Sequence, residues 1–289
     1  MDRASKKTII VFTALAIVFI FAIFWIAPRN SVPSARPRVT VTIFPLYDIV
    51  RNIAGSFADV TLILPPGAEP HSFEPSPSVV RKVSSSAVVY AIGHGLDDWI
   101  DPISKTADVP KTIVDSGILL RENSDPHYWL TIPNAILIVD TVAADLGRRF
   151  PGEDQYFKDN AAAYRARLEK LDDKIRPMLA GATNRRIVTF HDAWYYFADA
   201  YGLEIVGTFE PTPGREPTPR ALGELRKTIV HNQVHTVFAE PLFSDAAIEA
   251  FARDQGLAIA KIDDLGGTPG RESYEELMLS NAKIIAESL

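Results

Sequence analysis

The stretch DQYFKDNAAAYRARLEKLDDKIRPML, residues 154–179, decides how the rest of the chain is interpreted. Its charged residues point to a solvated surface, and its apolar residues recur every three or four positions. That spacing places the apolar side chains on one face of an α-helix. About 25 helical residues span roughly 38 Å, enough to join two lobes of a protein. A coiled-coil partner helix is the alternative. The apolar positions are Phe157, Ala161, Tyr164, Leu168, Leu171, Ile175 and Met178.

Strands and helices alternate on both sides of this predicted helix. Short β-branched runs occur at 39–44, 60–64 and 87–92 before it, and at 186–190, 204–209, 236–239 and 258–262 after it. Such alternation is typical of parallel α/β sheets. We therefore predict the α/β class, with two lobes of mostly parallel sheet, residues 38–152 and 181–289, joined by one long backbone helix, residues 153–180.

Composition excludes several classes of protein. The 289 residues are 47% hydrophobic and 23% charged, as in folded globular proteins. The absence of cysteine excludes disulfides, thiolate metal sites and lipid-modified cysteine. The net charge is −6, and because residues 1–30 carry +3, the remainder carries −9. This acidic balance argues against nucleic-acid binding and suits a cationic solute.

The N-terminal residues 1–30 have the pattern of a signal or a membrane anchor. Arg3, Lys6 and Lys7 precede an unbroken apolar run from Ile9 to Ala27. The run is close to the roughly 20 residues of a membrane span, and no convincing cleavage site follows. We favour an uncleaved anchor over a cleaved signal. Residues 31–37 form a linker, and the positive-inside rule places the rest outside the cytoplasm.

Four residues that can bind metal follow predicted strands, two in each lobe. They are His71, His127, His191 and Asp263. Ligands of open α/β sheets bind beyond the carboxyl ends of the strands, so these side chains could meet between the lobes. Three imidazoles and one carboxylate suit Zn²⁺, with Mn²⁺ or Fe²⁺ as alternatives.

Each candidate also has an ordinary structural explanation. A loop histidine is usually a surface or capping residue, and Asp263 could simply be a turn residue. Asp264 is a close rival of Asp263 for the carboxylate position. His94 and Glu240 also follow predicted strands and rank below these candidates. His231 and His235 flank a predicted helix end and are interpreted as structural.

Five motifs together resemble the zinc/manganese-type solute-binding proteins of metal ABC transporters. The resemblance covers roughly residues 38–289 and implies two α/β lobes joined by a rigid helix. It also implies a receptor, not an enzyme, that captures a divalent transition metal in the interlobe cleft and delivers it to an ABC permease. The motifs are GAEPHSFEPSP (67–77), DPHYWL (125–130), FHDAWYYFADAYGL (190–203), FAEPLFS (238–244) and IDDLGG (262–267).

Carried over motif by motif, the resemblance implies that His71, His127, His191 and Asp263 are the metal ligands. Histidine at position 191, where manganese-selective relatives often carry glutamate, favours Zn²⁺ as the bound solute over Mn²⁺ or Fe²⁺. Residues 104–124 lack the histidines of the acidic loop found in many zinc-uptake relatives.

The resemblance also sets expectations for partners and location. We expect a monomer in the periplasm or at the cell surface, tethered by its N-terminal apolar segment, with a permease and a metal ion as partners and no nucleic acid. A metal-dependent surface adhesin is the alternative function. A zinc hydrolase is less favoured, because the sequence contains no HExxH motif.

Overall fold

The computed structural model describes residues 36–121, 124–210, 217–241 and 245–289. Residues 37–289 form one compact unit. The predicted anchor at 1–30, and the linker at 31–37 up to residue 35, lie outside the described residues. Within the described ranges, no helix combines the length and apolarity that a membrane crossing needs.

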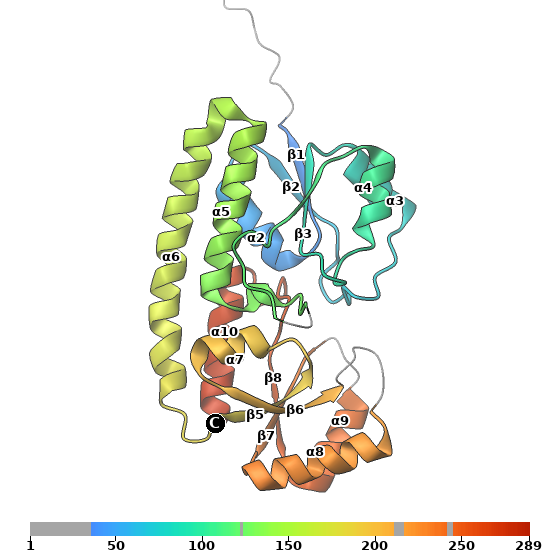
Figure 1. Ribbon diagram of the computed structural model, residues 1–289, viewed down its shortest axis with the longest axis vertical. Coiled ribbons are helices and arrows are strands. Elements are labelled where there is room, and N and C mark those ends of the chain that lie inside the picture. The colour runs from blue at the N-terminus through green and yellow to red at the C-terminus, as the bar shows by residue number, and fades with distance from the viewer. Residues whose placement is uncertain (1–35, 122–123, 211–216, 242–244) are drawn as a thin grey trace, which may run out of the picture. The chain divides into compact units, whose positions relative to one another are not determined.

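Strands and helices alternate along the described chain, as the sequence predicts (Figure 1). The long predicted helix appears as α6, and short 3₁₀ segments precede α5 and α6. In chain order the elements are β1 (Arg38–Val41), α2 (Phe44–Ala54), β2 (Asp59–Leu62), α3 (Pro77–Ser84), β3 (Val88–Ala91), α4 (Ile100–Ala107), β4 (Lys111–Ile113), η1 (Tyr128–Leu130), α5 (Ile132–Arg149), η2 (Pro151–Glu153), α6 (Asp154–Ala180), β5 (Arg186–His191), α7 (Tyr195–Tyr201), β6 (Glu204–Glu210), α8 (Pro219–Asn232), β7 (Thr236–Ala239), α9 (Asp245–Gln255), β8 (Ala258–Lys261) and α10 (Tyr274–Ser288).

Two four-stranded sheets, one on each side of α6 in the sequence, confirm the predicted α/β class. Their strand orders are β2-β1-β3-β4 and β6-β5-β7-β8, so the second sheet repeats the order of the first. Every pairing between these strands is parallel. Strand β4 has no counterpart among the predicted strands, because its three residues are too few for a recognisable pattern.

Helix α6 begins and ends within a residue of the predicted stretch. Its apolar stripe is buried with one change: Leu179 is buried, whereas Met178 is 37% exposed. The stripe continues in steps of four from Leu171 through Ile175 to Leu179, and Met178 lies off that line. Helix α6 packs mainly against α2, α5 and α10 of the same chain, which accounts for the stripe without a coiled coil.

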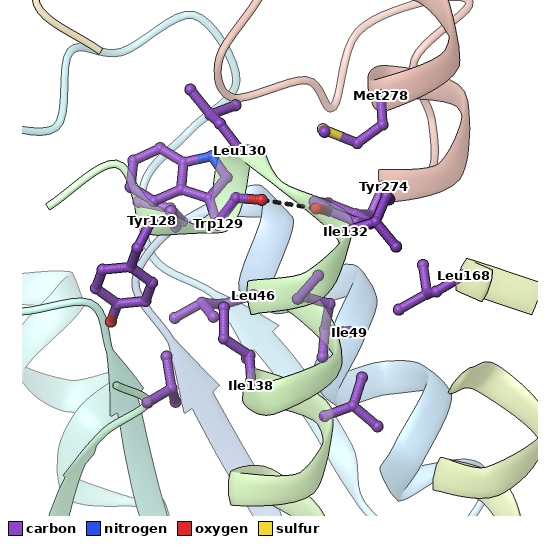
Figure 2. Close-up of a cluster of buried hydrophobic side chains, with 14 of the residues drawn as sticks. Leu46, Ile49, Tyr128, Trp129, Leu130, Ile132, Ile138, Leu168, Tyr274 and Met278 are labelled. Atoms are coloured by element: carbon purple, nitrogen blue, oxygen red, sulfur yellow. Dashed lines mark hydrogen bonds between the residues drawn. The ribbon is translucent and has the colours of Figure 1, made fainter. Parts of the chain in front are cut away.

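One hydrophobic core draws residues from both lobes. Leu46 of α2, Leu168 of α6 and Met278 of α10 belong to it, together with Trp129 and Tyr274 (Figure 2). The Tyr274 hydroxyl donates to the backbone oxygen of Trp129 over 2.6 Å. Two smaller clusters lie within the separate lobes. The shared core fixes the segments that carry the candidate ligands.

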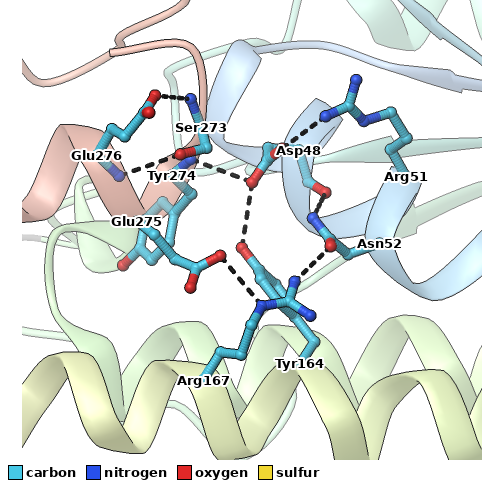
Figure 3. A network of polar contacts seen from close by, with 9 residues as sticks. All are labelled: Asp48, Arg51, Asn52, Tyr164, Arg167, Ser273, Tyr274, Glu275 and Glu276. Atoms are coloured by element: carbon cyan, nitrogen blue, oxygen red, sulfur yellow. Dashed lines mark hydrogen bonds and ion pairs between the residues drawn. The ribbon is translucent and has the colours of Figure 1, made fainter. Parts of the chain in front are cut away.

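A buried carboxylate ties together three helices that are distant in sequence. Asp48 on α2 accepts from the hydroxyl of Tyr164 on α6 over 3.2 Å and from the backbone N–H of Tyr274 over 3.1 Å (Figure 3). Arg51 pairs with the same carboxylate. A capping box between Ser273 and Glu276 begins α10 at this point.

Candidate metal-binding site

The structure brings the three predicted imidazoles together. The Nε2 atoms of His71 and His127 lie 3.4 Å apart. The ring centroid of His127 lies 5.3 Å from that of His191. His71 belongs to the loop after β2, His127 immediately precedes η1, and His191 is the last residue of β5. Segments from both lobes therefore meet at one point.

The carboxylate that converges with His127 and His191 belongs to Asp264. One ligand atom each from His127, His191 and Asp264 lie within 4.8 Å of one another. The Asp264 Oδ1 atom is buried and has no hydrogen-bond partner. A buried carboxylate oxygen without a donor is costly, and a cation at this point would offset that cost.

Asp263, which the sequence resemblance implies as the carboxylate ligand, bonds other partners in the structure. Its Oδ1 accepts the backbone N–H groups of Leu265 and Gly266, and its Oδ2 pairs with Arg271 over 3.1 Å. Asn281 on α10 bonds both the backbone N–H and the backbone oxygen of Asp263. Asp263 therefore shapes the turn that directs Asp264 toward the imidazoles.

Local contacts fold each histidine segment into place. The Glu69 carboxylate accepts the backbone N–H groups of His71 and Ser72 over 3.0 and 2.7 Å. The Trp99 indole donates to the backbone oxygen of Pro70 over 3.0 Å. These hydrogen bonds fold the loop after β2 into a tight turn, from which the imidazole of His71 reaches that of His127.

Two carboxylates contact the Nδ1 atoms of the other two imidazoles, those of His127 and His191. The Asp125 Oδ1 atom is 2.8 Å from His127 Nδ1 and also accepts the His127 backbone N–H. The Glu240 Oε2 atom is 2.8 Å from His191 Nδ1, and its Oε1 accepts the Trp194 indole N–H over 2.6 Å. Sequence reasoning missed the role of Asp125, although its position two residues before His127 is a usable signal.

The segments that carry His127 and Asp264 also hold each other across the lobes. The Trp129 indole donates to the backbone oxygen of Asp264 over 2.8 Å. Tyr274, at the start of α10, in turn bonds the backbone of Trp129. The positions of these two candidate ligands are therefore coupled through one chain of buried hydrogen bonds.

Burial and neighbouring charges set different protonation for the three histidines. Burial lowers the pKa of His127 to about 4, although its bond to Asp125 opposes the shift. Burial also lowers the pKa of His71. Burial acts in the same direction on His191, but the charge and hydrogen bond of Glu240 outweigh it and raise the pKa of His191 to about 9. Burial raises the pKa of Asp264 to about 7, against the opposing charge of His191.

The remaining histidines lie outside this cluster. His94 pairs with Asp115 over 2.9 Å. His231 lies in the last turn of α8, and His235 is exposed just before β7. Among the described residues, the group of His127, His191 and Asp264 is the one whose donor atoms converge closely enough to hold a metal ion.

Comparisons with known proteins agree with this picture. The family model "Zinc-uptake complex component A periplasmic" matches residues 39–288. The manganese-binding lipoprotein MntA of Halalkalibacterium halodurans is 32% identical over 84% of this chain and 85% of its own length. The zinc-binding lipoprotein AdcA of Streptococcus pneumoniae is 26% identical over 95% of this chain, which spans only 60% of that relative's length.

A solved structure of a metal solute-binding protein is also similar to this chain. The solute-binding protein FpvC of Pseudomonas aeruginosa, in complex with Mn²⁺, has a TM-score of 0.80 and 29% identity over 88% of this chain and 98% of its own. The family model covers most of the chain, and the MntA match is extensive on both sides. The chain therefore belongs to the periplasmic zinc-uptake component A family of metal solute-binding proteins.

Proposed function

We propose that this protein captures a divalent transition metal ion outside the cytoplasm and delivers it to an ABC permease. The proposed ligands are His71, His127, His191 and Asp264. The observation that carries the proposal is the convergence of His127, His191 and the unpartnered Asp264 oxygen in a buried position. Such an arrangement of buried polar atoms is expensive unless a cation occupies it.

Zn²⁺ is the ion that this donor set fits best. Three imidazole nitrogens and one carboxylate oxygen form a tetrahedral set of the kind that binds Zn²⁺. Mn²⁺ fits less well, because it favours oxygen ligands in octahedral geometry. Fe²⁺ fits less well, because four protein ligands leave none of the open positions of its usual two-histidine, one-carboxylate sites. The relatives differ in this respect: AdcA is named for zinc and MntA for manganese, and FpvC has been solved with Ni²⁺ and with Mn²⁺.

Four protein ligands support a receptor over a hydrolase. A catalytic zinc keeps one coordination position for water, whereas four side chains complete the tetrahedron of a bound ion. Because the ligands come from both lobes, the bound ion would hold the lobes together. The long helix α6, packed along both, would restrict their separation.

Removal of one proposed ligand at a time tests the site. Zn²⁺ affinity is measured by chelator competition for the parent, His71→Ala and Asp264→Ala, with His235→Ala as the control because His235 is exposed and outside the cluster. We expect both site variants to lose affinity and the control to match the parent. Equal affinity in the parent and His71→Ala would show that the ion binds elsewhere. Elemental analysis of protein purified without chelator identifies the ion.

The proposed location rests on the apolar run at 9–27. Two relatives are named as lipoproteins, but this sequence has no cysteine to carry a lipid. We propose that the N-terminal segment itself is the tether. Cell fractionation of the full chain and of a variant that carries a cleavable signal in place of residues 1–30 tests this. The full chain should fractionate with membranes and the variant should be released.

A further inference from the structure

Both carboxylate oxygens of Glu240 are hydrogen-bonded, one of them to His191. The Glu240 side chain is fully buried. The two oxygens bond two different rings: Oε2 lies 2.8 Å from His191 Nδ1, and Oε1 accepts the Trp194 indole N–H over 2.6 Å. The carboxylate therefore lies between an indole and an imidazole. Because its two oxygens are equivalent acceptors, rotation of the carboxyl group does not change the hydrogen bond to either ring.

The chemistry of the three groups determines where the proton of the imidazole lies. An indole nitrogen can only donate, and an ionised carboxylate can only accept. The atom of His191 that faces Glu240 must therefore carry a proton. When Nδ1 keeps that proton, Nε2 is the nitrogen that presents a lone pair to the cluster with His127 and Asp264.

We infer that Glu240 is a positioning residue that fixes His191 in the Nδ1–H form, and that Trp194 makes this function depend on a carboxylate. The inference rests on the proposed function, because it concerns the nitrogen that would bind the metal. Glu240 itself does not contact the ion. Its effect is exerted through the orientation and proton of His191.

Glutamine at position 240 would reverse this arrangement. A glutamine side chain has one acceptor oxygen and one donor NH₂ group. Since Trp194 can only donate, the oxygen turns toward Trp194 and the NH₂ group turns toward His191. The imidazole then has to accept at Nδ1, which places its proton on Nε2, the nitrogen needed for the metal.

Asp125 supplies a matched control. It also lies behind a candidate ligand, but a single oxygen, Oδ1, meets both the His127 backbone N–H and His127 Nδ1. Asparagine can keep that oxygen in place and accept from both groups. Asp125→Asn therefore removes one negative charge next to an imidazole, as Glu240→Gln does, without reversing the direction of the hydrogen bond.

The experiment measures Zn²⁺ affinity by chelator competition on the full-length chain. The proteins are the parent, Glu240→Gln, Trp194→Phe, the double variant Trp194→Phe/Glu240→Gln, and Asp125→Asn. Loss of an outer partner of a metal ligand typically costs about 10–100-fold in affinity. We expect Glu240→Gln at the upper end, about 100-fold, and Asp125→Asn below about 10-fold.

Restored binding in the double variant is the distinctive expectation. Phenylalanine has no N–H group to donate to the glutamine oxygen, so that oxygen can turn to His191 and accept from Nδ1. We expect the double variant to bind at least about 10-fold more tightly than Glu240→Gln. A role in packing alone gives no reason for Trp194→Phe to restore the binding that Glu240→Gln has lost.

A second measurement detects the imidazole directly. The ¹⁵N chemical shifts of the His191 ring are recorded without metal, at a pH where the ring is neutral in both Glu240→Gln and the double variant. We expect the Nε2–H form in the first and the Nδ1–H form in the second. This comparison decides the inference even if Trp194→Phe alone binds poorly, because it does not depend on affinity.

The outcomes separate the inference from the proposed function. Parent protein that fails to bind Zn²⁺, Mn²⁺ or Fe²⁺ would overturn the proposed function. Parent protein that binds, together with Glu240→Gln of equal affinity, would overturn the inference alone. The inference is also overturned if the double variant binds as weakly as Glu240→Gln and its ring remains in the Nε2–H form.

Discussion

Metal affinity should rise with pH up to about pH 9, because one histidine of the proposed site is protonated at neutral pH. The pKa of His191 is raised to about 9 by Glu240, against the effect of burial. A bound metal ion requires a lone pair on His191, so binding displaces a proton. Each pH unit below 9 then costs tenfold in apparent affinity. At pH 7 the affinity is about 100-fold below its value above pH 9.

The other ligands change the slope only in acid. Burial raises the pKa of Asp264 to about 7, so a second proton competes with the metal below that pH and the slope approaches about two. Burial lowers the pKa of His127 to about 4, so this ring is already neutral and contributes nothing near pH 7. Acid should therefore weaken binding in two steps and not in one.

Isothermal titration of Zn²⁺ in buffers of different ionisation enthalpy counts the released protons. We expect about one proton per ion at pH 8 and none well above pH 9. Affinity from chelator competition between pH 6 and pH 10 gives the same information independently. Affinity that does not change between pH 7 and pH 9, or a single break near 6.5, the ordinary pKa of histidine, would refute the reasoning.

Four further substitutions test the structure. Asp264→Asn should weaken Zn²⁺ binding more than Asp263→Asn, and the reverse order of affinities in metal titrations would restore Asp263 as the ligand. Asp48→Ala leaves the Tyr274 N–H and the Tyr164 hydroxyl without their acceptor, so the free energy of unfolding in urea should fall by about 3 kcal/mol; a loss below about 1 kcal/mol would contradict the bonding described. Gly267→Ala should also lower the midpoint of thermal unfolding, because φ is +76° and a Cβ would lie 2.9 Å from Phe44; an unchanged midpoint would contradict that packing.

Features set by local sequence could be predicted. Helix α6 could be predicted because its apolar residues are regularly spaced over seven positions and its other faces carry charged residues. His71, His127 and His191 could be proposed because each lies in a distinctive motif. The capping box at Ser273 could also be recognised, since its partner is three residues away.

Features set by distant contacts could not be predicted. Asp263 and Asp264 are adjacent and chemically identical, and what separates them is the bonding of Asp263 to Arg271 and to Asn281 on a later helix. Glu240 could be seen to follow a strand, but its place behind His191 depends on the pairing of β5 with β7. The raised pKa of His191 depends on that same contact, so the sequence suggested only an ordinary histidine value.

The core shared by both lobes has a consequence for how the chain matures. Helix α2, the first described helix, packs against α10, the last, and both belong to the same apolar cluster. The amino-terminal half emerging from a ribosome or a translocation channel would therefore still lack one wall of its interior. Fragments produced separately by a cut within α6 should expose apolar surface and aggregate. They should become soluble only when both fragments are present together.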